Sequence, residues 1–90
     1  MKYKLIFSPK SYKQIKKYSK VLKKRIEKAC EEIEKDPFHR GTIKVEGYRN
    51  IRRKRIGRYR ILYMIDEQMK EILIIKVEKR SGQTYKNIIQ

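Results

Sequence analysis

A dense group of cationic side chains lies in the middle of the chain, in the segment "RRKRIGRYRILY" (residues 52–63). Six of the first nine residues of this segment are Arg or Lys, and the segment then becomes apolar. A guanidinium group stays protonated and offers planar pairs of N–H donors that hold two phosphate oxygens at once. The segment therefore favours chemistry on a phosphate group, either binding it or stabilising negative charge that develops on it.

RNA supplies part of such a reaction itself, because its 2′-hydroxyl can attack the adjacent phosphate. A protein then has to align the reacting groups, remove a proton, protonate the 5′-oxygen and stabilise the added negative charge. We expect Arg60 and Arg80 to stabilise that charge. Neighbouring cations favour the deprotonated form of a lysine or a tyrosine, so either Lys54 or Tyr85 is a candidate general base.

Other nuclease chemistries find less support in the sequence. A metal-dependent nuclease needs clustered carboxylates, and a histidine-based ribonuclease needs two histidines. His39 is the only histidine, and we expect it in a surface loop. We therefore expect no metal and no cofactor. The alternative to catalysis is that the basic segment is a passive phosphate-binding surface.

The hydrophobic pattern predicts the elements that must position these residues. Alternation in "YKLIF" (residues 3–7) predicts a first strand. Ser8, as an N-cap, and Pro9, at the first helical position, then open an amphipathic helix. The helical period breaks near residues 19–21 and restarts in a second helix, which Pro37 ends. The two helices are expected to form a hairpin with arms of unequal length.

After residue 41 the apolar pattern changes to a period of two, which is typical of strands. Gly47, Gly57 and "DEQMK" separate four segments that are expected to form an antiparallel meander, at residues 42–46, 48–56, 58–65 and 71–77. Together with the first strand and the helical pair, this predicts an α+β fold in which the helices pack on one face of the sheet. The C-terminal residues are expected to form a short helix or a tail.

Strand alternation distributes the charged residues between the two faces of the predicted sheet. The core face is marked by Tyr59, Ile61, Tyr63 and Ile65. The opposite face is free to carry an arginine cluster, which we define as Arg53, Arg55 and Arg60. Arg52 and Lys54 are directed toward the helices, unless a bulge, an edge position or snorkelling of their stems carries the charges to water.

The last strand is expected to extend this cluster. Alternation puts Arg80 on the same side as Ile72, Ile74, Lys76 and Glu78, with Tyr85 nearby. Arg80 and Tyr85 could therefore converge with the arginine cluster. The residues expected to bind RNA are Arg52, Arg53, Arg55, Arg58 and Lys79.

The composition fits one small folded domain that spans residues 1–90 and meets a polyanion. Lys and Arg number 26 against 10 Asp and Glu, which gives a net charge of +16 at pH 7. Such self-repulsion is tolerated when an acidic partner neutralises it. The single cysteine, Cys30, excludes an internal disulfide and is expected in the core. No apolar run has the length of a signal peptide or a membrane span, so we expect a cytoplasmic protein.

The segments "RKRIGRYRILYMID" and "EILIIKVEKRSGQTY" resemble the RelE/ParE superfamily of bacterial and archaeal toxins. The matching pattern is Arg-x-Arg-[Val/Ile]-Gly-x-Tyr-Arg-[apolar]-x-Tyr, followed by an apolar strand that ends near a basic residue and a tyrosine. It is carried here by Arg53, Arg55, Gly57, Tyr59, Arg60 and Tyr63. The resemblance implies that Arg53 and Arg55 line a cleft and that Arg60 contacts phosphate. It also implies that Arg80 is the basic residue at the end of the last strand and that Tyr85 is the tyrosine that follows it.

The resemblance also implies a compact fold related to microbial RNases and a toxin of a type II toxin–antitoxin system. A RelE-like member is expected to be a ribosome-dependent, metal-independent endoribonuclease that cuts mRNA in the A site and arrests translation. Its implied partners are an acidic RelB-like antitoxin and the ribosome with its mRNA and rRNA. The alternatives are a ParE-like inhibitor of DNA gyrase and a non-catalytic RNA-binding module.

Overall fold

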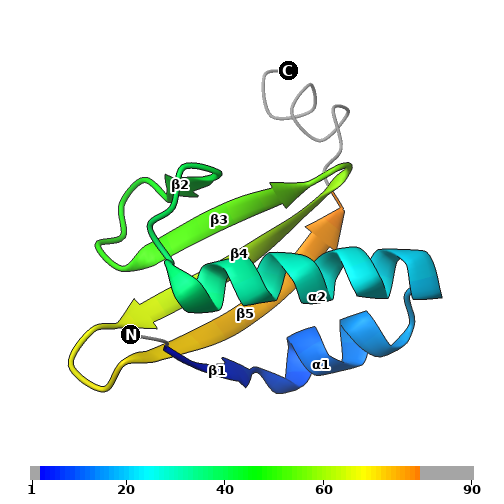
Figure 1. Ribbon diagram of the computed structural model, residues 1–90, viewed down its shortest axis with the longest axis horizontal. Coiled ribbons are helices and arrows are strands. Elements are labelled where there is room, and N and C mark those ends of the chain that lie inside the picture. The colour runs from blue at the N-terminus through cyan, green and yellow to red at the C-terminus, as the bar shows by residue number, and fades with distance from the viewer. Residues whose placement is uncertain (1–2, 80–90) are drawn as a thin grey trace.

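The computed structural model describes residues 3–79. Its elements, in chain order, are β1 (Lys4–Phe7), α1 (Pro9–Lys16), α2 (Lys20–Lys35), β2 (Thr42–Lys44), β3 (Ile51–Ile56), β4 (Tyr59–Asp66) and β5 (Glu71–Lys79). The strands form one sheet in the order β1-β5-β4-β3-β2 (Figure 1). The segment expected to be a C-terminal helix or tail lies outside the described residues.

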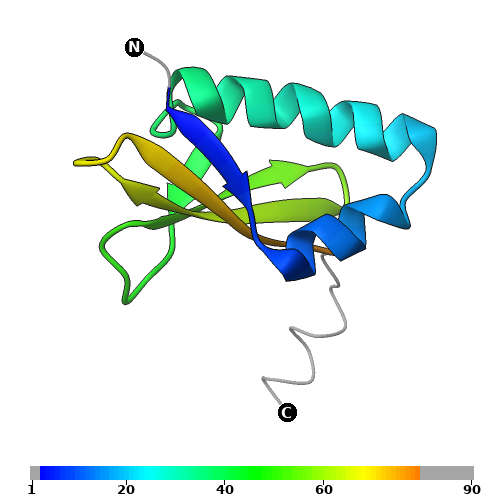
Figure 2. The same ribbon diagram turned by 90° about the horizontal axis from the view of Figure 1, so that it is seen from below.

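Strands β2 to β5 form the antiparallel meander that the sequence predicts, whereas β1 pairs with β5 in parallel. Because β1 and β5 run in the same direction, the chain has to return through a crossover, and the helical hairpin begins it. Helix α1 runs along the edge of β5, where the Val77 N–H donates to Gln14 Oε1, and α2 lies over one side of the sheet (Figure 2). We call this side the helix face and the opposite side the open face, since within residues 3–79 no helix covers it. The predicted α+β fold is confirmed.

Local capping explains where the helical hairpin begins and bends. The Ser8 hydroxyl accepts a hydrogen bond of 3.0 Å from the backbone N–H of Ser11, and Pro9 opens α1. The Ser19 hydroxyl accepts from the N–H of Leu22 at 3.2 Å and so caps the start of α2. Each cap satisfies an N–H that has no partner inside its helix. The break predicted near residues 19–21 therefore lies at a second N-cap.

The core fills the space between α2 and the sheet. It consists of Ile26, Ala29, Cys30 and Ile33 from α2 and Ile56, Ile61, Tyr63, Ile65, Ile72, Ile74 and Val77 from the strands. The predicted core face of β4 is confirmed, with Ile61, Tyr63 and Ile65 buried. Tyr59 is half-buried and packs edge-on against Tyr18, in the turn between α1 and α2, with 5.2 Å between the ring centroids. This contact joins the turn of the helical hairpin to the start of β4.

A β-bulge in β5 corrects one prediction. Leu62 pairs with Lys76 and Tyr63 pairs with Ile74, so β5 carries one extra residue at this point. An extra residue reverses the alternation beyond it. Ile72 and Ile74 therefore face the helices, whereas Lys76 and Glu78 lie on the open face. The prediction that these four residues share one side is wrong, because it assumed uninterrupted alternation.

Cys30 provides a test of this packing. The thiol is buried, and burial, assisted by the negative charges of Glu34, Glu27 and Glu31, raises its pKa to about 12. At about pH 8 only about one thiol in ten thousand is then ionised, against roughly a quarter in an unfolded chain. We expect Cys30 to react with a disulfide reagent such as DTNB at least about 100-fold more slowly in the native protein than in denaturing urea. Fast labelling of the folded protein would contradict the packing of α2.

Candidate nucleic-acid interface

The open face carries the arginine cluster. In the antiparallel pair β3 and β4, Arg53 pairs with Leu62 and Arg55 pairs with Arg60. Directly paired residues project from the same face of a sheet, so the three arginines lie together. Arg53 and Arg55 are exposed, and Arg60 is partly buried. This placement agrees with strand alternation, while the role of the cluster in binding RNA stays a prediction.

Arg60 is held by an acidic neighbour that sequence reasoning did not identify as part of the site. Its Nε donates to Oε2 of Glu78 at 2.5 Å, and Lys76 Nζ lies 3.1 Å from Oε1 of the same carboxylate. Partial burial by itself raises the pKa of the Glu78 carboxyl, but hydrogen bonds from Lys76 and Arg60 outweigh this and bring the pKa below its usual value. Glu78 is therefore ionised at neutral pH. The sequence did not indicate Glu78 as a partner of Arg60, because strict alternation places Glu78 on the same face as Ile72 and Ile74. The bulge in β5 reverses that alternation.

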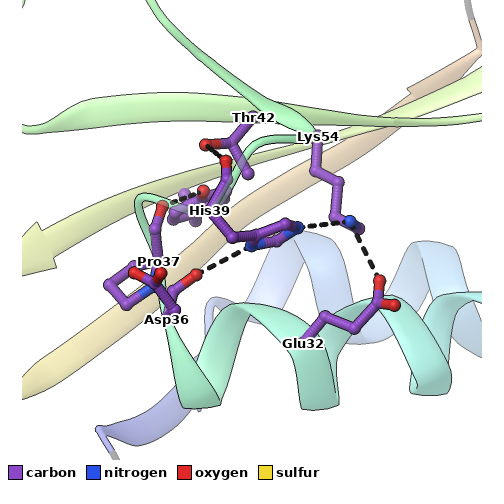
Figure 3. A network of polar contacts seen from close by, with 7 residues as sticks. Glu32, Asp36, Pro37, His39, Thr42 and Lys54 are labelled. Atoms are coloured by element: carbon purple, nitrogen blue, oxygen red, sulfur yellow. Dashed lines mark hydrogen bonds and ion pairs between the residues drawn. The ribbon is translucent and has the colours of Figure 1, made fainter.

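Lys54 lies on the helix face, where it joins three parts of the fold (Figure 3). It pairs with Ile61 across the strands, and its side chain is 11% exposed. Its Nζ lies 2.9 Å from Oε1 of Glu32 on α2 and 2.6 Å from Nε2 of His39. The sheet therefore separates Lys54 from Arg60. The two residues expected to share a catalytic site are not brought together.

His39 acts here as a hydrogen-bonding link. Its Nδ1 lies 2.7 Å from the backbone carbonyl of Asp36, which can only accept, so Nδ1 carries the proton. Nε2 then accepts a hydrogen bond from the Lys54 ammonium. The carbonyl of His39 accepts from Oγ1 of Thr42 at 2.8 Å. His39 therefore lies in the loop between α2 and β2, as expected, and these bonds tie that loop to the sheet.

Of the remaining predicted RNA-binding residues, Arg52 and Lys79 lie on the other face from the arginine cluster, and Arg58 lies in the turn next to it. Arg52 is on the helix face, where Nε donates to Oγ1 of Thr42 at 3.0 Å and the guanidinium lies over the Phe38 ring at 5.5 Å. Arg58 is exposed in the turn between β3 and β4, and Lys79 is exposed at the end of β5, paired with Tyr59 of the helix face. Arg80 and Tyr85 lie outside the described residues.

Residues 3–79 carry neither a metal-binding cluster nor a membrane-spanning helix. No group of three or more His, Cys, Asp or Glu side chains is arranged to hold a metal ion there. Neither helix is both long and apolar enough to cross a membrane.

The Lys54 contacts should stabilise the fold, and replacing Lys54 by methionine should measure by how much. Loss of the bonds to Glu32 and His39 should reduce the free energy of unfolding by about 1 kcal/mol, because both partners remain accessible to water. The bond from Lys54 holds the pKa of the Glu32 carboxyl below its usual value. Stability from this pair is thus present above the usual glutamate pKa and is lost as the pH falls through the lowered value.

Urea unfolding of the wild type and Lys54→Met at several pH values tests this expectation. The difference between them should be present at neutral pH and should shrink in acid. Lys24→Met, an exposed lysine of α2, is the matched control and should have little effect. A difference between wild type and Lys54→Met that does not change with pH would show that the ion pair contributes nothing.

Comparison with known proteins identifies the family. The sequence profile described as the ParE toxin of type II toxin-antitoxin system, parDE, matches residues 5–84. A chain in the crystal structure of the archaeal RelE-RelB complex from Pyrococcus horikoshii OT3 is similar, with a TM-score of 0.80, 26% identity and coverage of 91% of this chain and 99% of that chain. The comparison with curated proteins found no match to this chain.

More distant structures share the fold. The isolated E. coli RelE toxin gives a TM-score of 0.81 at 19% identity, covering 97% of this chain and 95% of that one. The YoeB dimer from Staphylococcus aureus gives 0.74 at 18% identity, covering 90% of this chain and 100% of that one. These matches confirm the resemblance that the sequence motifs indicate. The chain belongs to the ParE toxin family of type II toxin–antitoxin systems, within the RelE/ParE superfamily.

Proposed function

We propose that this toxin is a ribosome-dependent endoribonuclease, which cuts mRNA in the ribosomal A site by metal-independent attack of the RNA 2′-hydroxyl. The observation that carries the proposal is the arginine cluster on the open face. Only Nε of Arg60 is bonded within residues 3–79, which leaves its terminal nitrogens to hold a phosphate. The similarity to an archaeal RelE adds support.

The proposed chemistry assigns a role to each part of the open face. Arg60 holds the non-bridging oxygens of the scissile phosphate and stabilises the charge that grows on them in the transition state. Arg53 and Arg55, two residues apart on β3, bind neighbouring phosphates of the same strand. Arg80 is proposed to assist Arg60. Tyr85 is proposed as the general base, because Lys54 is bound by Glu32 and His39 on the helix face.

Ribosome dependence is the test of this function. The described part of the open face offers arginines but no histidine as an efficient base, so much of the alignment has to come from the ribosome. We expect the purified protein to cut ribosome-bound mRNA far faster than the same mRNA free in solution. Single-turnover rates on the two substrates measure this. Equal rates would reject the ribosome-dependent mechanism.

A second candidate function is inhibition of DNA gyrase, which the match to the ParE toxin profile favours. In that case the arginine cluster would serve as a binding surface and not as a catalytic site. Expression of the protein in cells separates the two functions. Translation arrest with mRNA cut inside codons supports the ribonuclease, whereas DNA damage with intact mRNA supports the gyrase inhibitor. A plain RNA-binding module would produce neither result.

An acidic RelB-like antitoxin is the proposed partner, and the cytoplasm is the proposed location. The charge of +16 requires neutralisation, and one of the similar structures is a RelE–RelB complex. The open face offers two kinds of contact to such a chain. One is the arginine cluster, and the other is a row of directly paired apolar residues that crosses four strands, Ile6, Leu73, Met64 and Ile51. A segment with acidic and apolar residues, folding as it binds, would match both.

A further inference from the structure

Three charged residues form a continuous row across the open face. Arg55 of β3 pairs with Arg60 of β4, and Arg60 pairs with Glu78 of β5. Like charges that lie directly opposite each other in a sheet repel. Arg60 therefore has a repulsive neighbour on one side and an attractive one on the other. The row draws the Arg60 side chain toward β5 and away from Arg55.

We propose that Glu78 is a positioning residue, which holds Arg60 in the orientation needed to bind the scissile phosphate. This inference rests on the proposed ribonuclease function. Glu78 does not touch the substrate in this arrangement. It acts on the reaction through Arg60 alone.

The atoms used in the contact support this role. Glu78 accepts from Nε of Arg60, the nitrogen nearest the aliphatic stem, through Oε2. The outer edge of the guanidinium, with its two terminal nitrogens, then stays directed away from the carboxylate and can bind two phosphate oxygens. A carboxylate that occupied this outer edge would instead compete with the phosphate.

The carboxylate is itself fixed from a second side. Lys76 Nζ lies 3.1 Å from Oε1, so each oxygen of Glu78 has its own cationic partner. The side chain is only 27% exposed. A long arginine side chain on a strand otherwise has several rotamers available, and each non-productive rotamer reduces the rate. The contact with Glu78 selects one of them before the substrate arrives.

Two substitutions distinguish positioning from competition with the phosphate. Glu78→Ala removes the acceptor, whereas Glu78→Gln keeps an oxygen that can accept from Arg60 Nε but removes the negative charge. If Glu78 positions Arg60, the alanine variant should lose about tenfold to a hundredfold in maximal cleavage rate, and the glutamine variant should recover most of that loss. If Glu78 competes with the phosphate, both variants should cleave faster than the wild type.

Single-turnover cleavage of ribosome-bound mRNA gives the maximal cleavage rate and the ribosome concentration at half saturation. Glu78→Ala should lower the rate at saturating ribosomes without raising the half-saturating ribosome concentration. Glu67→Ala, an exposed acid beyond the other end of β4, changes the net charge equally and serves as the control. The inference is overturned if Glu78→Ala cuts at the wild-type rate or faster, if only the half-saturating concentration changes, or if Glu78→Gln is as impaired as Glu78→Ala.

A measurement on the free protein separates this inference from the function on which it rests. In arginine-labelled protein, the Nε proton of Arg60 should exchange with water more slowly than that of Arg58, which lies in an exposed turn. The protection should disappear in Glu78→Ala and persist in part in Glu78→Gln. If the wild type shows this protection but cuts no mRNA, the proposed function fails while the contact stands. Equal exchange of Arg60 and Arg58 in the wild type would overturn the positioning role directly.

Discussion

Replacing Arg60 by alanine is expected to reduce the rate of mRNA cleavage on the ribosome by about 10²–10³. The guanidinium stabilises negative charge that grows as the 2′-oxygen attacks the phosphate, so its loss affects the transition state more than the bound ground state. Arg60→Lys is the sharper variant, because lysine keeps the charge but loses the two-pronged donor geometry. We expect this variant to fold, to bind ribosomes and to be strongly impaired in cleavage.

Affinity measured beside the rate separates catalysis from binding. For single-stranded RNA, the loss of one phosphate contact changes the slope of the logarithm of the binding constant against the logarithm of the salt concentration by only about 0.7. Lys24→Ala, an exposed lysine on α2 and thus on the other side of the sheet, should change neither the rate nor this slope appreciably. If Arg60→Lys cut at nearly the wild-type rate, or if every loss of rate matched an equal loss of affinity, the arginine cluster would be a binding surface only.

Replacing Tyr63 by alanine is expected to cost about 3–5 kcal/mol of unfolding free energy. Tyr63 is 0% exposed and lies in the centre of β4. Its hydroxyl donates to the backbone carbonyl of Pro37 at 2.6 Å and so ties the loop after α2 to the sheet. Native domains have unfolding free energies of only about 5–15 kcal/mol, so the variant should lose a large part of the total stability.

The tyrosine hydroxyl can be tested apart from the ring. Tyr63→Phe keeps the packing but leaves the Pro37 carbonyl without its donor, which should cost about 1–3 kcal/mol. Burial raises the pKa of the Tyr63 phenol, so it stays protonated and able to donate throughout the neutral range. Urea unfolding of the two variants gives both values, and Tyr48→Ala, at an exposed tyrosine, is the control. If Tyr63→Phe and wild type were equally stable, the loop would be held by its other bonds alone.

The elements of the fold could be predicted because their signals are local. Ser8 is the N-cap that the sequence predicts, and Ser19 caps α2 within the break predicted at residues 19–21. Pro37 follows the end of α2, as expected. The alternation of β4 placed Ile61, Tyr63 and Ile65 in the core, because one sheet face is covered and the other is not. Parallel pairing of β1 with β5 joins residues far apart in the chain, and no local pattern indicated it.

The candidate site was predictable in part. The sequence by itself determined the basic composition, the resemblance to the toxin superfamily and the common face of Arg53, Arg55 and Arg60, since alternation within two neighbouring strands requires only local information. Tertiary structure alone decided that Lys54 is engaged by Glu32 and His39 on the helix face. It also decided that a bulge in β5 brings Glu78 to Arg60. A bulge is set by the register between two paired strands, and an ion pair by the packing of distant elements, so neither can be read from the order of residues in one strand.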